Sequence, residues 1–348
     1  MKVNFSSTEI AITQALDEGM SVNDQFIQNL VDGAIKSTAT HLLADLKESA
    51  ANKIAERQRM RLGFEQRLYE RWRQALDLFD LILIVTEETG SDFLKKHHQQ
   101  AIHSSDFVFE VLNRLHARAC LTASEIGTLL KSGHAAGALA RWRTLHELSV
   151  VAYFVHKHGQ DVAKRYLLHE VVESYKAAKD YERCYTQLGY APTDPQEVRE
   201  LKASCTALYQ RFGKAFGEQY GWAAEILNKQ RPSFADIERS VNLNHMRAHY
   251  RMSSHGIHAN QRGSTFNPGV LGVHKVLLTG PSNAGLADAG HSTLISLVQC
   301  TCELLALRPE DETVIMCLTL VQLVDEAGQA FLDVHENLIR EEEEKLQT

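Results

Sequence analysis

Proline is scarce in this chain, and that scarcity constrains the fold more than any other feature of the sequence. Only 6 of the 348 residues are proline. Proline lacks a backbone N–H and its ring clashes with the preceding helical turn, so it breaks helices. Residues that favour helices, such as Ala, Leu, Glu and Gln, are frequent throughout the chain. The sequence therefore predicts an all-α protein.

The overall composition is that of a folded protein with a hydrophobic core. Apolar residues make up 44% of the chain and charged residues 23%, which argues against a disordered chain. The formal charge is 37 − 44 = −7 with histidine neutral, so a generally basic surface for nucleic acid is not expected. A local basic groove remains compatible with that charge.

Cysteine spacing and hydropathy favour a cytoplasmic protein. None of the 6 cysteines forms a C-x-x-C pair, so neither a zinc ribbon nor a secreted disulfide framework is expected. The amino terminus lacks the apolar segment of a signal peptide. The longest apolar runs, near 81–85 and 148–155, are too short to span a bilayer. We therefore expect no membrane association.

The apolar residues recur at the spacing of amphipathic helices along most of the chain. We expect one or two helices over 8–62, continuing to Val85 and interrupted at Thr89-Gly90-Ser91. Later helices are expected over 104–132, 134–158, 161–188, 195–217, 219–229, 234–258, 292–307 and 310–345. Residues 259–290 hold six glycines together with Pro268 and Pro281, which predicts a loop-rich insertion. The expected organisation is an N-terminal helical arm over 1–100 and a multi-helix bundle over 101–348.

The end of the arm carries a run of basic residues. Between Lys53 and Gln74, seven Lys and Arg residues face three Glu residues, with Tyr69 and Trp72 among them. A solvated helix face is one explanation. The other is a stripe that faces a polyanion such as RNA.

The helix expected over 134–158 carries the first polar cluster, Arg141-Trp-Arg143-Thr-Leu-His146-Glu147. Arg143, His146 and Glu147 share a face because residues three and four apart are neighbours on a helix, and Arg141 lies on an adjoining stripe. Small residues before this cluster would let another helix approach closely. An internal Arg143–Glu147 ion pair with a hydrogen-bonded His146 is the structural alternative to a functional site.

The second polar cluster is His249-Tyr250-Arg251-Met-Ser-Ser254-His255-Gly-Ile-His258. Tyr250, Ser254 and His258 align at helical spacing, and Arg247, Arg251 and His258 form a basic band. A site that moves protons and binds an anion needs such side chains together. The structural alternative is a polar helix end that frays into the glycine-rich loop.

Metal binding is the rival use of these histidines. The sequence contains no H-E-x-x-H motif and no paired Glu-x-x-His, so we expect neither a metal nor a cofactor. Zinc held by His255, His258 and one distant ligand is an open alternative. Phosphate-binding loops, dinucleotide-binding fingerprints and nucleophile elbows are also missing from the sequence.

The two clusters together resemble the bacterial family called domain of unknown function 5677. The likeness rests on Arg143-Thr-Leu-His-Glu147 and on Tyr250…Ser254…His258, and it covers roughly residues 100–262. It implies that Arg143, Glu147, Tyr250, Ser254 and His258 form the site. The family name supplies no reaction.

A looser likeness is to the helical HEPN ribonucleases, which carry Arg-x(4–6)-His. Arg141-x4-His146 and Arg251-x6-His258 fit this spacing. The likeness implies metal-independent RNA cleavage. Arginine would hold the phosphate and histidine would move protons, with Arg141, His146, Arg247, Arg251 and His255 contacting the substrate.

Three functions stay open from the sequence. The leading hypothesis is a metal-independent ribonuclease of the toxin or phage-defence type, acting on RNA and controlled by a regulatory partner protein. The second is a non-enzymatic scaffold that forms homo-oligomers through its amphipathic termini, 8–62 and 310–345. The third is a small-molecule or metal enzyme that uses the histidine-rich edge of the loop.

Overall fold

A computed structural model describes residues 6–18, 23–257, 261–265, 267–271 and 277–347. Within these ranges all regular structure is helical: α1 to α11 and three short 3-10 helices, η1 to η3, with no strand. The all-α prediction is confirmed.

The chain divides into two compact units, residues 1–67 and 68–348. The division falls inside the long helix α2 (Asp24–Ser104). The reason is burial, because Leu68, Trp72, Leu76 and Phe79 of α2 lie in the core of the second unit.

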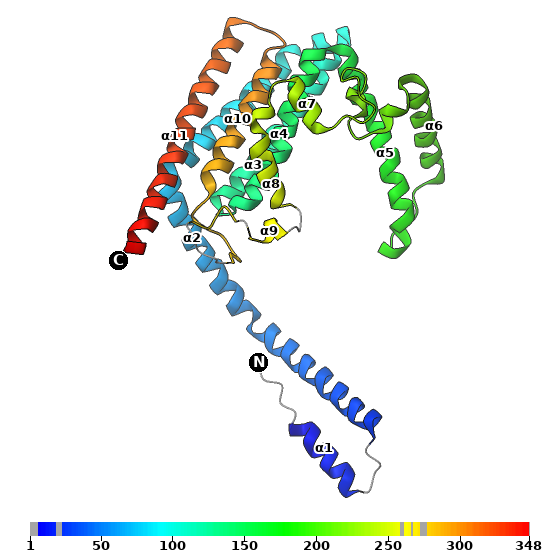
Figure 1. Cartoon of the computed structure of the whole chain (residues 1–348), viewed down its shortest axis with the longest axis vertical. Coiled ribbons are helices and arrows are strands. Elements are labelled where there is room, and N and C mark those ends of the chain that lie inside the picture. Colours follow the sequence, from blue (N-terminus) through cyan, green and yellow to red (C-terminus); the bar gives the residue numbers. More distant parts are fainter. Residues whose placement is uncertain (1–5, 19–22, 258–260, 266, 272–276, 348) are drawn as a thin grey trace. The chain divides into compact units, whose positions relative to one another are not determined.

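The first unit consists of α1 (Ser6–Asp17) and the first part of α2 (Figure 1). Among its described side chains only Ala15 is buried. Apolar side chains of α2 in this unit are exposed to solvent, including Ile35, Leu43, Leu46 and Ile54. This part of α2 therefore has a helical backbone and an apolar stripe but no core of its own.

The predicted helix break at Thr89-Gly90-Ser91 is wrong, since α2 continues through it to Ser104. Gly90 serves packing instead. A Cβ built on Gly90 would lie 2.2 Å from Cε1 of His116, which belongs to α3 (Phe107–Lys131). Glycine at position 90 thus lets the His116 ring pack directly against the backbone of α2.

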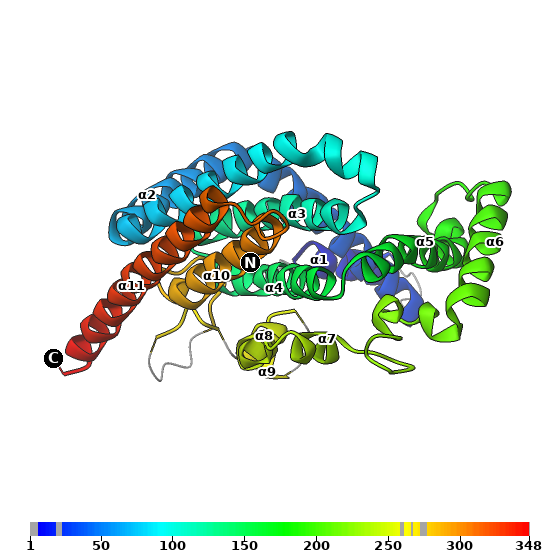
Figure 2. The same ribbon diagram turned by 90° about the horizontal axis from the view of Figure 1, so that it is seen from above.

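The core of the second unit is a bundle formed by the second part of α2 with α3, α4 (Ala135–His158), α10 (Leu286–Leu305) and α11 (Asp311–Gln347). Figure 2 shows these helices side by side. The centre of α4 is enclosed, and its Trp142 is fully buried, donating from Nε1 to the Ser292 carbonyl of α10 at 2.9 Å. Trp72 of α2 and Phe331 of α11 pack with ring centroids 5.9 Å apart.

Two long helices, α5 (Gln160–Leu188) and α6 (Pro195–Phe212), form a hairpin at one edge of this unit (Figure 1). The sequence predicted α5 closely. The turn after it contains Gly189, whose φ of 71° closes the helix in the left-handed conformation that glycine adopts readily.

The region after α6 is more broken than predicted. The expected helix over 195–217 ends at Phe212 because Gly213 has a φ of 83°. It is followed by η1 (Lys214–Gly217) and η2 (Gly221–Ala223). The expected helix over 234–258 is three elements: α7 (Phe234–Ser240), η3 (Asn244–Met246) and α8 (Arg247–His255), with Asn242 at a φ of 61° between the first two.

The predicted loop insertion, 259–290, is shorter than expected. Described parts include the short helix α9 (Gln261–Thr265) and loop residues up to Gly285. α10 already begins at Leu286, after Gly285 in the left-handed conformation. The end of the loop is fixed to the bundle, because Trp72 Nε1 donates to the Asn283 carbonyl at 3.1 Å.

Among the described residues, one helix, α11, is long and apolar enough to cross a membrane by length and composition. A core helix of a soluble protein meets the same criterion. Leu320, Val324 and Phe331 of α11 are buried, and the helix packs along α10.

Candidate functional site

The two polar clusters of the sequence meet in space between α4 and α8. α4 follows a tight turn in which Gly133 has a φ of 75° and the His134 N–H donates to the Leu129 carbonyl at 2.8 Å. The helix is central, so its polar side chains must find partners inside the protein. α8 and α7 lie along it and supply them.

The hydroxyl of Tyr250 on α8 joins the two polar side chains of α4. Arg143 Nη2 donates to Tyr250 Oη at 2.8 Å, and Tyr250 Oη donates to Oε1 of Glu147. Arg143 and Glu147 are one helical turn apart and point to the same side, as the sequence predicted. The cluster therefore consists of a cation, a phenol and a carboxylate connected through one hydroxyl.

Aromatic packing fixes the tyrosine in this position. The Arg143 Cζ lies 4.3 Å from the centroid of the Tyr250 ring, which is the geometry of a cation–π contact. The ring of Phe234, from the start of α7, lies 5.0 Å from that of Tyr250. Tyr250 is 8% exposed, so its hydroxyl has little freedom to leave the bridge.

The surroundings keep the phenol protonated at neutral pH. Burial raises the pKa of Tyr250 to about 12, and its hydrogen bond to the Glu147 carboxylate raises it as well. Burial also raises the pKa of Tyr220, with a further contribution from the negative charge of Glu147. Both tyrosines are thus proton donors beside a carboxylate that can accept a proton.

A second polar group lies behind the first, and two of its three side chains, His146 and Glu238, are fully buried. His146 of α4 contacts Oε1 of Glu238 through Nε2 at 2.9 Å, and both side chains are 0% exposed. Arg247, at the start of α8, pairs with the other oxygen of Glu238. Buried charges are retained when they are paired in this way. The His146–Glu238–Arg247 group therefore ties α4, α7 and α8 together.

Three nitrogen atoms at this site are buried without a hydrogen-bond partner among the described residues: Nε of Arg143, Nδ1 of His146 and Nη2 of Arg247. Of these, Nη2 of Arg247 still has the ion pair with Glu238. An unpaired buried polar atom is costly, so Nε of Arg143 and Nδ1 of His146 mark places where a ligand, water or further side chain completes the network.

The remaining predicted residues take no described part in the bridge. Arg141 turns toward α3, where its Nε pairs with Glu125. Ser254 donates to the Tyr250 carbonyl at 2.8 Å within α8, and Arg251 is exposed. His255 is half-buried at the end of α8. His258 lies outside the described residues.

Two residues predicted to contact the substrate, His146 and Arg141, are held by other side chains of the protein. His146 has no exposed surface, and Arg141 is directed at α3. Successive side chains on a helix point in directions that differ by about 100°, so residues near Glu147 in sequence need not share its surroundings. His146 therefore supports the structure beside the bridge, and Arg141 connects α4 to α3.

Sequence reasoning missed Glu238, Phe234 and Tyr220. They come from α7 and the segment before it, where the sequence shows no motif. The carboxylate of Glu238 can be recognised as buried only once the fold is known. Among the residues that the structure describes, no three His, Cys, Asp or Glu side chains are placed to hold one metal ion.

Comparison with known proteins identifies the region that contains the site. No curated protein and no solved structure matches the chain. Residues 109–267 match the model of the family described as "Family of unknown function (DUF5677)", and this range includes α4, α7 and α8. The family resemblance seen in the sequence is confirmed, and residues 109–267 of this chain form a DUF5677-like region.

Proposed function

We propose that the Arg143–Tyr250–Glu147 cluster is the active site of a metal-independent ribonuclease. The observation that carries the proposal is the position of the Tyr250 hydroxyl, between a guanidinium and a carboxylate contributed by a different helix. Phosphodiester cleavage by acid–base catalysis needs a cation for the phosphate and groups that move protons.

Each side chain of the cluster has a distinct role in this proposal. Arg143 binds the scissile phosphate and stabilises the charge that develops on it. Glu147 accepts the proton of the attacking 2′-hydroxyl through Tyr250, and His258 protonates the leaving 5′-oxygen. The products are a 2′,3′-cyclic phosphate and a 5′-hydroxyl. Arg251 is exposed on α8 and is available to the RNA backbone.

Further cations support a polyanionic substrate. Lys53, Arg57 and Arg67 in the first unit form no ion pair with any described residue, and Arg61 forms one with Glu65. Lys53, Arg57 and Arg61 recur every four residues and so follow one face of α2. A row of exposed cations on one face suits a nucleic-acid backbone.

The test is a cleavage assay with labelled total RNA and tRNA in the presence of EDTA. Wild type is compared with Tyr250→Phe and His258→Ala. Arg141→Ala is the control, because Arg141 lies on α4 with two of the cluster residues but outside the cluster. We expect fragments with 2′,3′-cyclic ends from wild type and Arg141→Ala only. Equal cleavage by Tyr250→Phe, or no cleavage by wild type, would contradict the proposal.

A scaffold that forms homo-oligomers is the second candidate, and one observation favours it. The first part of α2 exposes an apolar stripe that no described residue covers, including Ile35, Leu43 and Leu46. A second copy of the chain would bury it. Light scattering should then show a dimer for the full chain and a monomer after deletion of residues 1–67. A monomeric full chain would exclude this candidate.

A further inference from the structure

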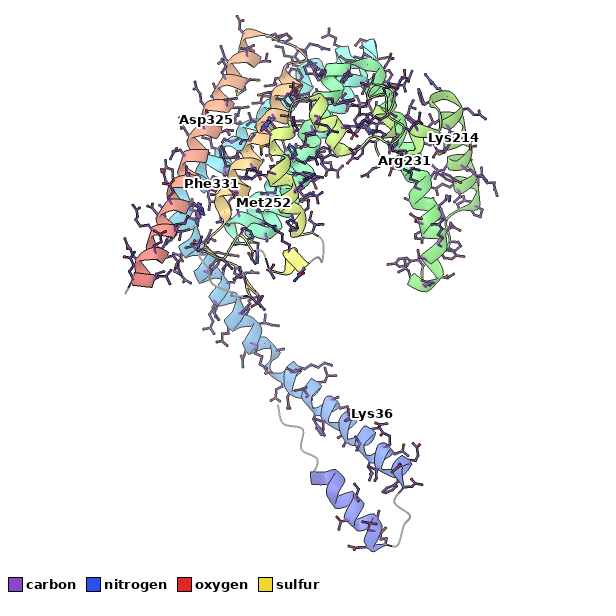
Figure 3. All side chains as sticks on the ribbon, in the orientation of Figure 1. Lys36, Lys214, Arg231, Met252, Asp325 and Phe331 are labelled. Atoms are coloured by element: carbon purple, nitrogen blue, oxygen red, sulfur yellow. The ribbon has the colours of Figure 1, made fainter. Side chains whose placement is uncertain are left out.

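The second unit contains a cavity that the residues of the Arg143–Tyr250–Glu147 cluster do not line. It has a volume of about 510 Å³ and is lined by η3, α8, α10 and α11. Its size is in the range of pockets that hold small organic molecules. Figure 3 labels two of its lining residues, Asp325 and Phe331, on α11.

The polar side chains of this cavity come from three different helices. α8 contributes His249, α10 contributes Asp288 and His291, and α11 contributes Asp325 and His335. The remaining walls are largely apolar, formed by Met246, Ile295, Phe331 and Leu332. A cavity with an apolar floor and a few converging polar groups is the usual form of a ligand site.

Packing between α10 and α11 holds the central histidine in place. A Cβ added to Gly328 of α11 would lie 2.5 Å from Nε2 of His291, so the imidazole rests where only glycine leaves room. Further along α11, Nδ1 of His335 is buried without a hydrogen-bond partner among the described residues. The cavity therefore has a closely packed wall at the contact of His291 with Gly328, and Nδ1 of His335 is a polar atom that no described residue satisfies.

The charge of the cavity is negative at neutral pH. Burial lowers the pKa of His291, although the nearby Asp325 and Asp288 act in the opposite direction. The imidazole of His291 is therefore neutral, and the two carboxylates determine the sign of the local potential. The neutral imidazole of His291 adds a hydrogen-bond acceptor to these carboxylates.

The spacing of these groups indicates the size of the ligand. Imidazoles and carboxylates are common metal ligands, but among the described residues no three of them can reach one ion. A ligand that contacts Asp288, Asp325 and His291 must therefore be larger than a single ion. It must also offer positive charge to the carboxylates and apolar surface to Phe331 and Leu332.

We propose that this cavity binds a small organic ammonium compound with an apolar body. The ammonium group contacts Asp325, the carboxylate of Asp288 adds negative charge to its surroundings, and the apolar body lies against Ile295 and Leu332. The proposal is independent of the ribonuclease activity, because it uses none of the cluster residues.

The experiment is calorimetric titration of the full chain at about pH 8 with benzylamine, whose amine is protonated there. Benzyl alcohol and phenylacetate serve as neutral and anionic compounds of similar shape. We expect saturable binding of benzylamine and at least about tenfold weaker binding of the other two, since both lack the charge attraction. Asp325→Asn should weaken benzylamine binding by about tenfold. Glu326→Gln is the matched control, because Glu326 is exposed on α11 and does not line the cavity.

Absence of benzylamine binding, equal binding of benzyl alcohol, or tighter binding of phenylacetate would each overturn the proposal. So would an Asp325→Asn variant that binds benzylamine as wild type does.

Discussion

The Tyr250 hydroxyl of α8 donates a hydrogen bond to the Glu147 carboxylate of α4, across 103 residues of sequence. The same hydroxyl accepts a hydrogen bond from Arg143 at 2.8 Å. This relationship makes two separate sequence motifs into one site. A substitution that tests the site should therefore remove the Tyr250 hydroxyl and keep the aromatic ring.

Replacement of Tyr250 by Phe removes the bridge and keeps the ring. The packing against Phe234 and Arg143 stays, so we expect helical circular dichroism to be unchanged. Two hydrogen bonds to charged groups are lost, which should lower the free energy of unfolding by about 1–3 kcal/mol. RNA cleavage should fall by about 100-fold or more, because a proton-transfer group is missing. Single-turnover cleavage kinetics and urea denaturation measure the two effects separately.

Arg143→Lys provides a second check on the same cluster. Lysine keeps the positive charge but loses the planar guanidinium that both donates to Tyr250 and covers its ring. We expect weaker RNA binding and slower cleavage than in Arg141→Lys, where the change lies outside the cluster. Comparable effects of the two substitutions would show that only the total charge of α4 matters.

The charge of Glu238 should matter for folding more than for any chemistry. Glu238→Gln leaves Arg247 without its buried anionic partner and weakens the contact with His146. Since Arg247 is partly exposed, we expect a loss of about 2–4 kcal/mol in the free energy of unfolding. Glu225→Gln is the control, because Glu225 is exposed and its ion pair with Arg165 should contribute less than about 1 kcal/mol. Guanidinium denaturation of both variants measures the two losses in the free energy of unfolding.

His116 should make the second unit sensitive to acid. Burial lowers its pKa from 6.5 to about 4, so the folded state holds the neutral ring while the unfolded state takes up a proton below pH 6.5. Its contribution is therefore present above pH 6.5 and lost as the pH falls toward 4, on the order of 3 kcal/mol in total. His116→Gln should flatten the dependence of stability on pH in that interval. His98→Gln, at an exposed position of α2, should leave it unchanged.

Two glycines of α2 should respond to alanine in opposite directions. Alanine is favoured over glycine in a helix by about 1 kcal/mol, and nothing lies within 4 Å of a Cβ at Gly33. Gly33→Ala should therefore stabilise the helix. At Gly90 the same Cβ would meet the His116 ring at 2.2 Å, so Gly90→Ala should destabilise the protein by about 1–3 kcal/mol. Thermal unfolding of the two variants, followed by circular dichroism, gives the sign of each change.

Helix boundaries were predictable from the sequence where a local conformation determined them. α4 and α5 begin and end within a residue or two of the predicted positions, because Gly133, Gly159 and Gly189 have positive φ values at their ends. The prediction was wrong at Gly90. The sequence there indicated a helix break, whereas in the structure this glycine leaves room for the His116 ring. A glycine that ends a helix and one that allows close packing look the same in a single sequence.

That Arg143 and Glu147 share a helix face was also predictable, because both residues belong to one helix and helical geometry relates them directly. That Tyr250 connects them was not, because it depends on how α8 packs against α4. Glu238 and the cavity between α8, α10 and α11 were missed for the same reason.

The sequence by itself determined that this chain is helical, where most of its helices lie and which polar residues share a helix face. Those properties follow from propensity, periodicity and turn conformation, which act over a few residues. Only the tertiary structure decided that the α4 and α8 motifs meet and that His146 is a buried support. It also decided that the second unit begins at Leu68. These depend on contacts between residues far apart in the chain, which are selected by the packing of whole helices and by the pairing of buried charges.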